Sequence, residues 1–147
     1  MTTDKDIATL NSLIATTIDS ADGYEQAAET DNAGELAQTF RQYAAERRSI
    51  VADLRGHVVR LGGNPEDDGT LLAAAHRQFL NLRAAFDNDV RTAVNEVERG
   101  EDVIKGKYEA ALDVELSPEV RQAVQRAYES VRAGHDTFSA MKKRYAA

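Results

Sequence analysis

The sequence of 147 residues contains no cysteine and only two prolines. Without cysteine the chain can form no disulfide, no thiolate nucleophile and no zinc site of the cysteine type. Scarce proline and few aromatic residues, beside abundant alanine, glutamate, arginine and glutamine, are typical of helical proteins. The composition therefore predicts an all-α fold.

Basic residues are outnumbered by acidic ones, 18 to 25. The formal net charge is −7 at pH 7, and no stretch carries the basic stripe that is usual on nucleic-acid-binding proteins. An acidic chain is not expected to dock on an anionic membrane surface either. We expect neither nucleic acid nor a membrane as a partner, and the composition leaves a homo-oligomer open.

Long hydrophobic runs are missing as well. The longest apolar run covers residues 71–75, far below the roughly 20 residues that a membrane-spanning helix needs. The amino terminus shows no basic segment followed by an apolar stretch, so no signal peptide is predicted. We expect a cytoplasmic protein with one domain over residues 1–147, which is long enough to form its own hydrophobic core.

Apolar residues recur every three or four positions over four long segments, which is the spacing of one helix face. The first helix is expected from about residue 4 to 29, and the second from about 35 to 61, where two glycines and a proline end it. Another helix follows Asp89. The last begins at Ser117, where a serine cap, a proline and an acid form the clearest helix start in the chain.

A shorter helical pattern over residues 70–86 decides the topology. At about 1.5 Å per residue it spans about 25 Å, enough to return the chain along the side of a bundle. The order would then be up-down-down-up with a crossover helix between the second and third long helices, as in a ferritin-like four-helix bundle. The alternative is a plain up-down bundle in which residues 70–112 form one long helix. Periodicity alone does not choose between them.

Glu101 stands on the apolar stripe of the helix expected over residues 90–112, between Val97 and Ile104. A buried carboxylate is costly unless it is paired or bound to a metal ion. The inward-facing Arg47 of the second helix is one partner, and the pattern favours this ion pair. A metal ion is the other partner.

Other polar side chains share this level of the expected bundle. If each helix rises about 1.5 Å per residue, five of them from four helices lie about 20–30 Å above the base. These candidate metal ligands are Glu25, Glu46, Glu98, Glu101 and His135. Carboxylates and an imidazole suit iron or manganese.

The remaining polar residues receive plainer interpretations. We expect His57 at the surface or its boundary, and we expect Tyr24, Tyr43, Tyr108 and Tyr128 at the core edge with their hydroxyls paired. No nucleophile elbow, phosphate-binding loop or dinucleotide fingerprint occurs. The sequence therefore leaves open whether the protein is an enzyme.

Several stretches together resemble a known bacterial family: Tyr24 after residues 19–22, LGG at 61–63, ERGED at 98–102 followed by YEAAL at 108–112, and HD at 135–136. They resemble the ferritin-like domain-of-unknown-function family 2383 over nearly the whole chain. The resemblance implies a ferritin-like bundle and brings no activity with it.

The ligand pattern of ferritin-like di-iron proteins is incomplete in this sequence. Those sites use a Glu-x-x-His pair on each of two helices, and no such pair occurs anywhere in the chain. The closest substitute is Glu98-x-x-Glu101, with Asp102 four residues after Glu98. The sequence predicts a divergent carboxylate/histidine site inside the bundle, with a metal-free structural or interaction module as the alternative.

Overall fold

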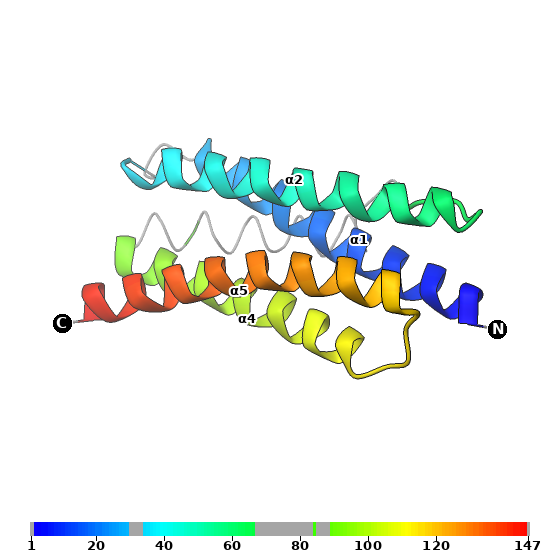
Figure 1. The fold of residues 1–147 in the computed structure, drawn as a ribbon. Coiled ribbons are helices and arrows are strands. Elements are labelled where there is room, and N and C mark those ends of the chain that lie inside the picture. The colour runs from blue at the N-terminus through cyan, green and yellow to red at the C-terminus, as the bar shows by residue number, and fades with distance from the viewer. Residues whose placement is uncertain (1, 30–33, 67–83, 85–88, 147) are drawn as a thin grey trace.

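The computed structural model describes residues 2–29, 34–66, 84 and 89–146. These residues form four helices and no strand: α1 (Thr2–Ala28), α2 (Leu36–Arg60), α4 (Val90–Leu112) and α5 (Pro118–Ala146). The helices lie alongside one another as a bundle (Figure 1), so the all-α prediction is confirmed. The crossover helix predicted over residues 70–86 falls outside the described residues, except for residue 84.

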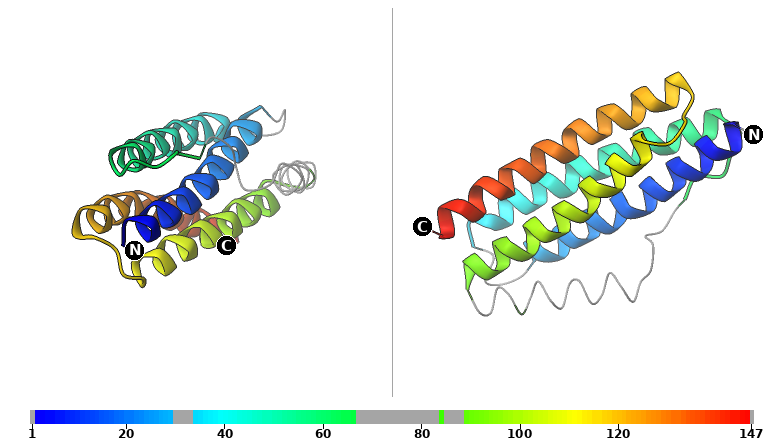
Figure 2. Two further views of the ribbon diagram at one scale, coloured as in Figure 1. Left: turned by 90° about the vertical axis from the view of Figure 1, so that its right-hand side faces the viewer. Right: turned by 90° about the horizontal axis from the view of Figure 1, so that it is seen from below.

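The helices pack as two pairs. α1 makes its largest interface with α2, and α4 makes its largest with α5. Figure 2 shows the two pairs stacked on each other, with α4 beside α1. The contacts between the pairs therefore bring side chains of all four helices to the middle of the bundle.

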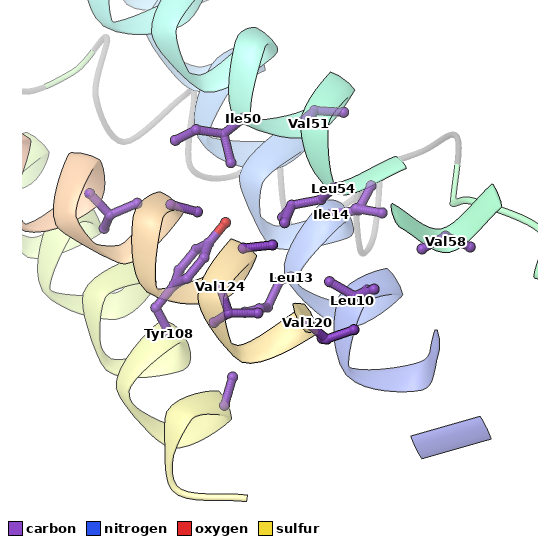
Figure 3. Close-up of a cluster of buried hydrophobic side chains, with 14 of the residues drawn as sticks. Leu10, Leu13, Ile14, Ile50, Val51, Leu54, Val58, Tyr108, Val120 and Val124 are labelled. Atoms are coloured by element: carbon purple, nitrogen blue, oxygen red, sulfur yellow. The ribbon is translucent and has the colours of Figure 1, made fainter. Parts of the chain in front are cut away.

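One hydrophobic cluster lies near the start of α1. It combines the first halves of α1 and α5 with the second halves of α2 and α4. Tyr108 projects from α4 among side chains of the other helices (Figure 3). Its hydroxyl lies 2.8 Å from Thr17 Oγ1, and because Thr17 donates its own hydrogen to the Leu13 carbonyl at 2.6 Å, Tyr108 is the donor. Burial raises the pKa of Tyr108 to about 12.

A second, aromatic cluster lies at the opposite end. It combines the end of α1, the first halves of α2 and α4, and the end of α5. The rings of Tyr24, Phe40, Tyr43 and Phe138 form stacked and tilted pairs with centroids 5.3–6.2 Å apart. Such ring pairs stabilise a core beyond the area that they bury. The two clusters are separated by a polar layer.

The predicted helix ends are confirmed where the structure describes them. α2 ends at Arg60 with Leu61 as its C-cap, and Gly62 follows with φ +84°, a conformation that glycine adopts without strain. α5 begins at Pro118, directly after the predicted serine cap. Asp89 has an extended backbone and caps α4, which excludes one uninterrupted helix over residues 70–112. None of the described helices is long and apolar enough to span a membrane.

Replacing Asp89 with alanine should lower the melting temperature near neutral pH. The Asp89 carboxylate accepts a hydrogen bond from the backbone N–H of Thr92 at 2.6 Å, and this bond lowers the pKa of Asp89. A lowered pKa means that the charged cap stabilises the fold above the unfolded value of about 3.9 and loses this effect as the pH falls through the folded value. Thermal melts of both proteins between pH 7 and pH 2 test this.

Asp113 provides the matched control, because it is the exposed C-cap of the same helix. An acid at a helix C-terminus opposes the helix dipole. Asp113→Ala should therefore leave the melting temperature unchanged or raise it slightly. An equal loss in both variants would contradict the capping role of Asp89.

Candidate functional site

The middle of the bundle holds a buried ion pair between α2 and α4. Arg47 Nη2 donates to Glu101 Oε1 at 2.7 Å, and Arg47 Nη1 donates to Glu101 Oε2 at 3.1 Å. Arg47 is 0% exposed and Glu101 2% exposed. This is the ion pair that the sequence pattern favoured, so that interpretation is confirmed.

The other two helices complete the surroundings of the ion pair. From α1, Ser20 Oγ accepts a second bond from Arg47 Nη1 at 3.1 Å, and the Tyr24 ring lies 5.7 Å from the guanidinium carbon. From α5, Gly134 approaches so closely that a Cβ built on it would lie 2.6 Å from Arg47 Nη2 and 2.9 Å from Glu101 Oε1. Residues from all four described helices therefore surround the ion pair.

The environment of this layer shifts the pKa values of Arg47 and Tyr24. Burial disfavours the charged guanidinium most strongly, but the charge and hydrogen bonds of Glu101, together with Tyr24 and Glu46, outweigh that effect and raise the pKa of Arg47. Burial and the Glu101 charge raise the pKa of Tyr24 well above its usual value. Arg47 Nε and the Tyr24 hydroxyl are buried without a hydrogen-bond partner among the described residues. For Tyr24 this differs from the paired hydroxyl that we expected.

A second polar cluster lies on the seam between α4 and α5. Glu98 and Asp102 are one helical turn apart on α4, and His135 faces them from α5. His135 Nε2 lies 2.5 Å from Asp102 Oδ1 and 3.9 Å from Glu98 Oε1. One ligand atom from each residue lies within 4.8 Å of the others, so the three could hold a metal ion.

This seam cluster is partly open to solvent and already has charged neighbours. The Glu98 and His135 side chains are 12% and 15% exposed, and that of Asp102 is 55% exposed. His135 Nδ1 lies 3.2 Å from Asp136 Oδ1, and Lys142 Nζ lies 3.1 Å from Glu98 Oε2. Partial burial disfavours the imidazolium, but the hydrogen bonds to Asp136 and Asp102 outweigh it and raise the pKa of His135.

The five residues proposed from sequence lie in four different places. Glu98 and His135 meet on the seam, whereas Glu101 is paired with Arg47. Glu25 is half exposed and accepts two bonds from Arg48, at 3.1 and 3.0 Å. Glu46 accepts a hydrogen bond from Ser130.

Two residues differ from what the sequence suggested. Asp102 joins Glu98 and His135, although only its spacing of four residues from Glu98 pointed to it. His57, expected at the surface or its boundary, is buried at 6% exposure. Arg60 Nη2, from one turn further along α2, lies 3.0 and 3.2 Å from the two ring nitrogens of His57.

These features define an all-α helical-bundle protein with a buried ion pair at its centre and a carboxylate–imidazole cluster on one seam. The chain belongs to the family described as domain of unknown function (DUF2383), whose model matches residues 5–114. The family resemblance seen in the sequence is thereby confirmed. Glu98 and Asp102 lie inside the matched range and His135 lies outside it. None of the curated proteins matches the chain.

Proposed function

We propose that this protein is a ferritin-like bundle that binds a divalent metal ion, iron or manganese, at Glu98, Asp102 and His135. The observation that carries the proposal is the convergence of three ligand atoms from two helices within 4.8 Å. Two carboxylates and one imidazole are a ligand set that such ions accept. The proposal keeps Glu98 and His135 from the sequence-based set and adds Asp102.

The ends of the helices support the ferritin-like topology within this proposal. α2 ends beside the cluster that contains Val58, and α4 begins beside the opposite cluster, which contains Ala93. The end of α2 and the start of α4 therefore lie at opposite ends of the bundle, which is the arrangement that a crossover connection requires. α2 and α4 would then be parallel, with α1 and α5 running the other way, in the order up-down-down-up.

The fit of a metal differs between the centre and the seam. At the centre, Arg47 already takes both oxygens of Glu101, so no ligand set is free there. At the seam, Asp136 accepts from Nδ1 and would hold the His135 ring with Nε2 facing the carboxylates. The metal would replace the proton on Nε2, and Lys142 would withdraw from Glu98.

Titration calorimetry with Mn²⁺, and elemental analysis after growth with added iron, test the proposal. We expect about one metal ion per chain, and its loss in His135→Gln and in Asp102→Asn, because each variant removes one of only three ligands. Glu25→Gln and Glu46→Gln are matched controls, since each removes one carboxylate at a different place, and binding should persist in both. Sub-stoichiometric metal, or binding that survives His135→Gln, would count against the site.

A metal-free structural or interaction module is the second candidate. It is favoured by one observation: His135 and Glu98 already have protein partners in Asp102, Asp136 and Lys142. A ligand that binds only the folded state raises its stability. Addition of a chelator should therefore lower the melting temperature if metal is held at the seam, and should leave it unchanged if the seam is only a polar network.

A further inference from the structure

We propose that the centre of the bundle is a cation site built for a planar guanidinium, which the chain fills with its own Arg47. The inference concerns a different layer from the seam cluster and does not depend on metal binding there. It assigns a ligand class to the layer: a small planar organic cation in place of a metal ion.

The donors and acceptors of this layer match the edge of a guanidinium. The two oxygens of the Glu101 carboxylate accept one hydrogen bond each, at 2.7 and 3.1 Å, from the two terminal nitrogens of Arg47. Ser20 accepts a further bond from Nη1 in another direction. This paired geometry fits a rigid planar fork and does not fit an ammonium point charge.

The faces of the site also suit a flat cation. The Tyr24 ring lies 5.7 Å from the guanidinium carbon, a distance at which an aromatic ring attracts a cation. On the α5 side lies Gly134. A Cβ at this position would collide with Arg47 Nη2 and the Glu101 carboxylate, so the absence of a side chain leaves room for both groups. The only helix residue that could stand so close to the ion pair without displacing it is one that lacks a side chain.

A metal ion would find too few ligands at this level. Within the described residues the buried carboxylates are Glu101 and Asp6. Asp6 lies near the start of α1, away from the central layer, where its carboxylate accepts a hydrogen bond from the backbone N–H of Ser117. One carboxylate with hydroxyl neighbours falls short of the set that divalent ions prefer. The single negative charge is instead balanced by the single positive charge of Arg47.

A cavity connects this layer with the surface between α1 and α4. It has a volume of about 310 Å³, and its lining includes the buried Tyr24 and Glu101, the half-buried Ser20 and the exposed Val103. Shortening the Arg47 side chain would vacate space beside Glu101, and because Glu101 lines this cavity we expect a small cation to reach that space.

Chemical rescue of Arg47→Ala tests the proposal. We expect methylguanidinium chloride at ten times its Kd to raise the melting temperature of this variant by about 3–6 °C over NaCl of equal ionic strength. Methylammonium and Mn²⁺ should give smaller shifts, because neither reproduces the paired hydrogen bonds. The double variant Arg47→Ala/Glu101→Gln is the matched control and should not respond, because it lacks the counter-charge.

Two results would overturn the proposal: equal responses to methylguanidinium and NaCl, or a larger response to Mn²⁺. If Arg47→Ala does not fold, NMR of the wild-type protein decides. The Nη protons of Arg47 should then give separate, slowly exchanging signals, because both nitrogens are held by Glu101. A single averaged signal with fast solvent exchange would refute the proposal.

Discussion

Replacing Arg47 with methionine should lower the free energy of unfolding by about 3–5 kcal/mol, because the Glu101 carboxylate is then left buried without its counter-charge. Arg47 is 0% exposed, so water cannot screen the loss. Methionine fills much of the arginine volume, which keeps the contribution of an empty cavity small. Urea denaturation of the two proteins at neutral pH measures the difference.

Arg48 offers a control next to Arg47 in the sequence. It contacts Asp22 and Glu25 at 2.5 and 3.0 Å, but its side chain is 40% exposed. Exposed ion pairs typically contribute about 0–1 kcal/mol. Arg48→Met should therefore change the stability far less than Arg47→Met, and similar losses in the two variants would contradict the importance of burial.

The double variant Arg47→Met/Glu101→Leu separates the ion pair from the charge left behind. Replacing both partners of a buried ion pair with apolar residues is often neutral or stabilising by about 1–4 kcal/mol. We expect the double variant to regain most of the stability that Arg47→Met loses. If it regains none, the loss comes from packing around Ser20 and Gly134.

The sequence predicted well those features that depend on position along a helix. The stripe of apolar residues on α4 identified the buried face of that helix. Glu101 is a charged residue on this buried face, so the sequence required a partner for its carboxylate. Arg47 occupied the equivalent position on the α2 stripe. The helix ends at Gly62, Asp89 and Pro118 also followed from local chemistry, because turn and cap residues act within a few positions.

The grouping of the candidate ligands could not be predicted in the same way. A rise of about 1.5 Å per residue gives the height of a side chain, but it does not give its direction around the helix axis closely enough to tell a core position from an edge. Glu25 has the right height, yet it turns outward to Arg48. Asp102 and His135 meet only because α4 and α5 pack closely, and this contact depends on tertiary packing that the sequence pattern does not show.

Gly134 is a second feature whose role could not be predicted from the sequence. A glycine inside a helix normally costs about 1 kcal/mol relative to alanine, so the sequence alone marks it only as a weak helix residue. Its importance comes from the atoms that α2 and α4 bring against it, 2.6 Å and 2.9 Å from where its Cβ would lie. No local pattern contains that information.

Gly134→Ala should therefore destabilise the protein by about 1–3 kcal/mol, the usual effect of overpacking a filled core, although alanine is the better helix former. The new methyl group would meet Arg47 Nη2 and Glu101 Oε1, and neither atom can move without weakening the ion pair. Gly106→Ala is the matched control, because Gly106 is exposed on α4 and a Cβ there has no neighbour within 4 Å. That variant should gain about 1 kcal/mol.

The opposite signs of these two glycine variants distinguish crowding from helix propensity. If propensity dominated, both variants would be stabilised, and the close approach of α5 to the ion pair would have no energetic weight. The crowding explanation makes a second prediction. In an Arg47→Ala background the guanidinium is gone, so Gly134→Ala should lower the free energy of unfolding less than it does in the wild-type protein. A penalty of the same size in both backgrounds would mean that the methyl group collides with something other than Arg47, and the remaining neighbours are Glu101 Oε1 at 2.9 Å and Tyr43 at 3.1 Å.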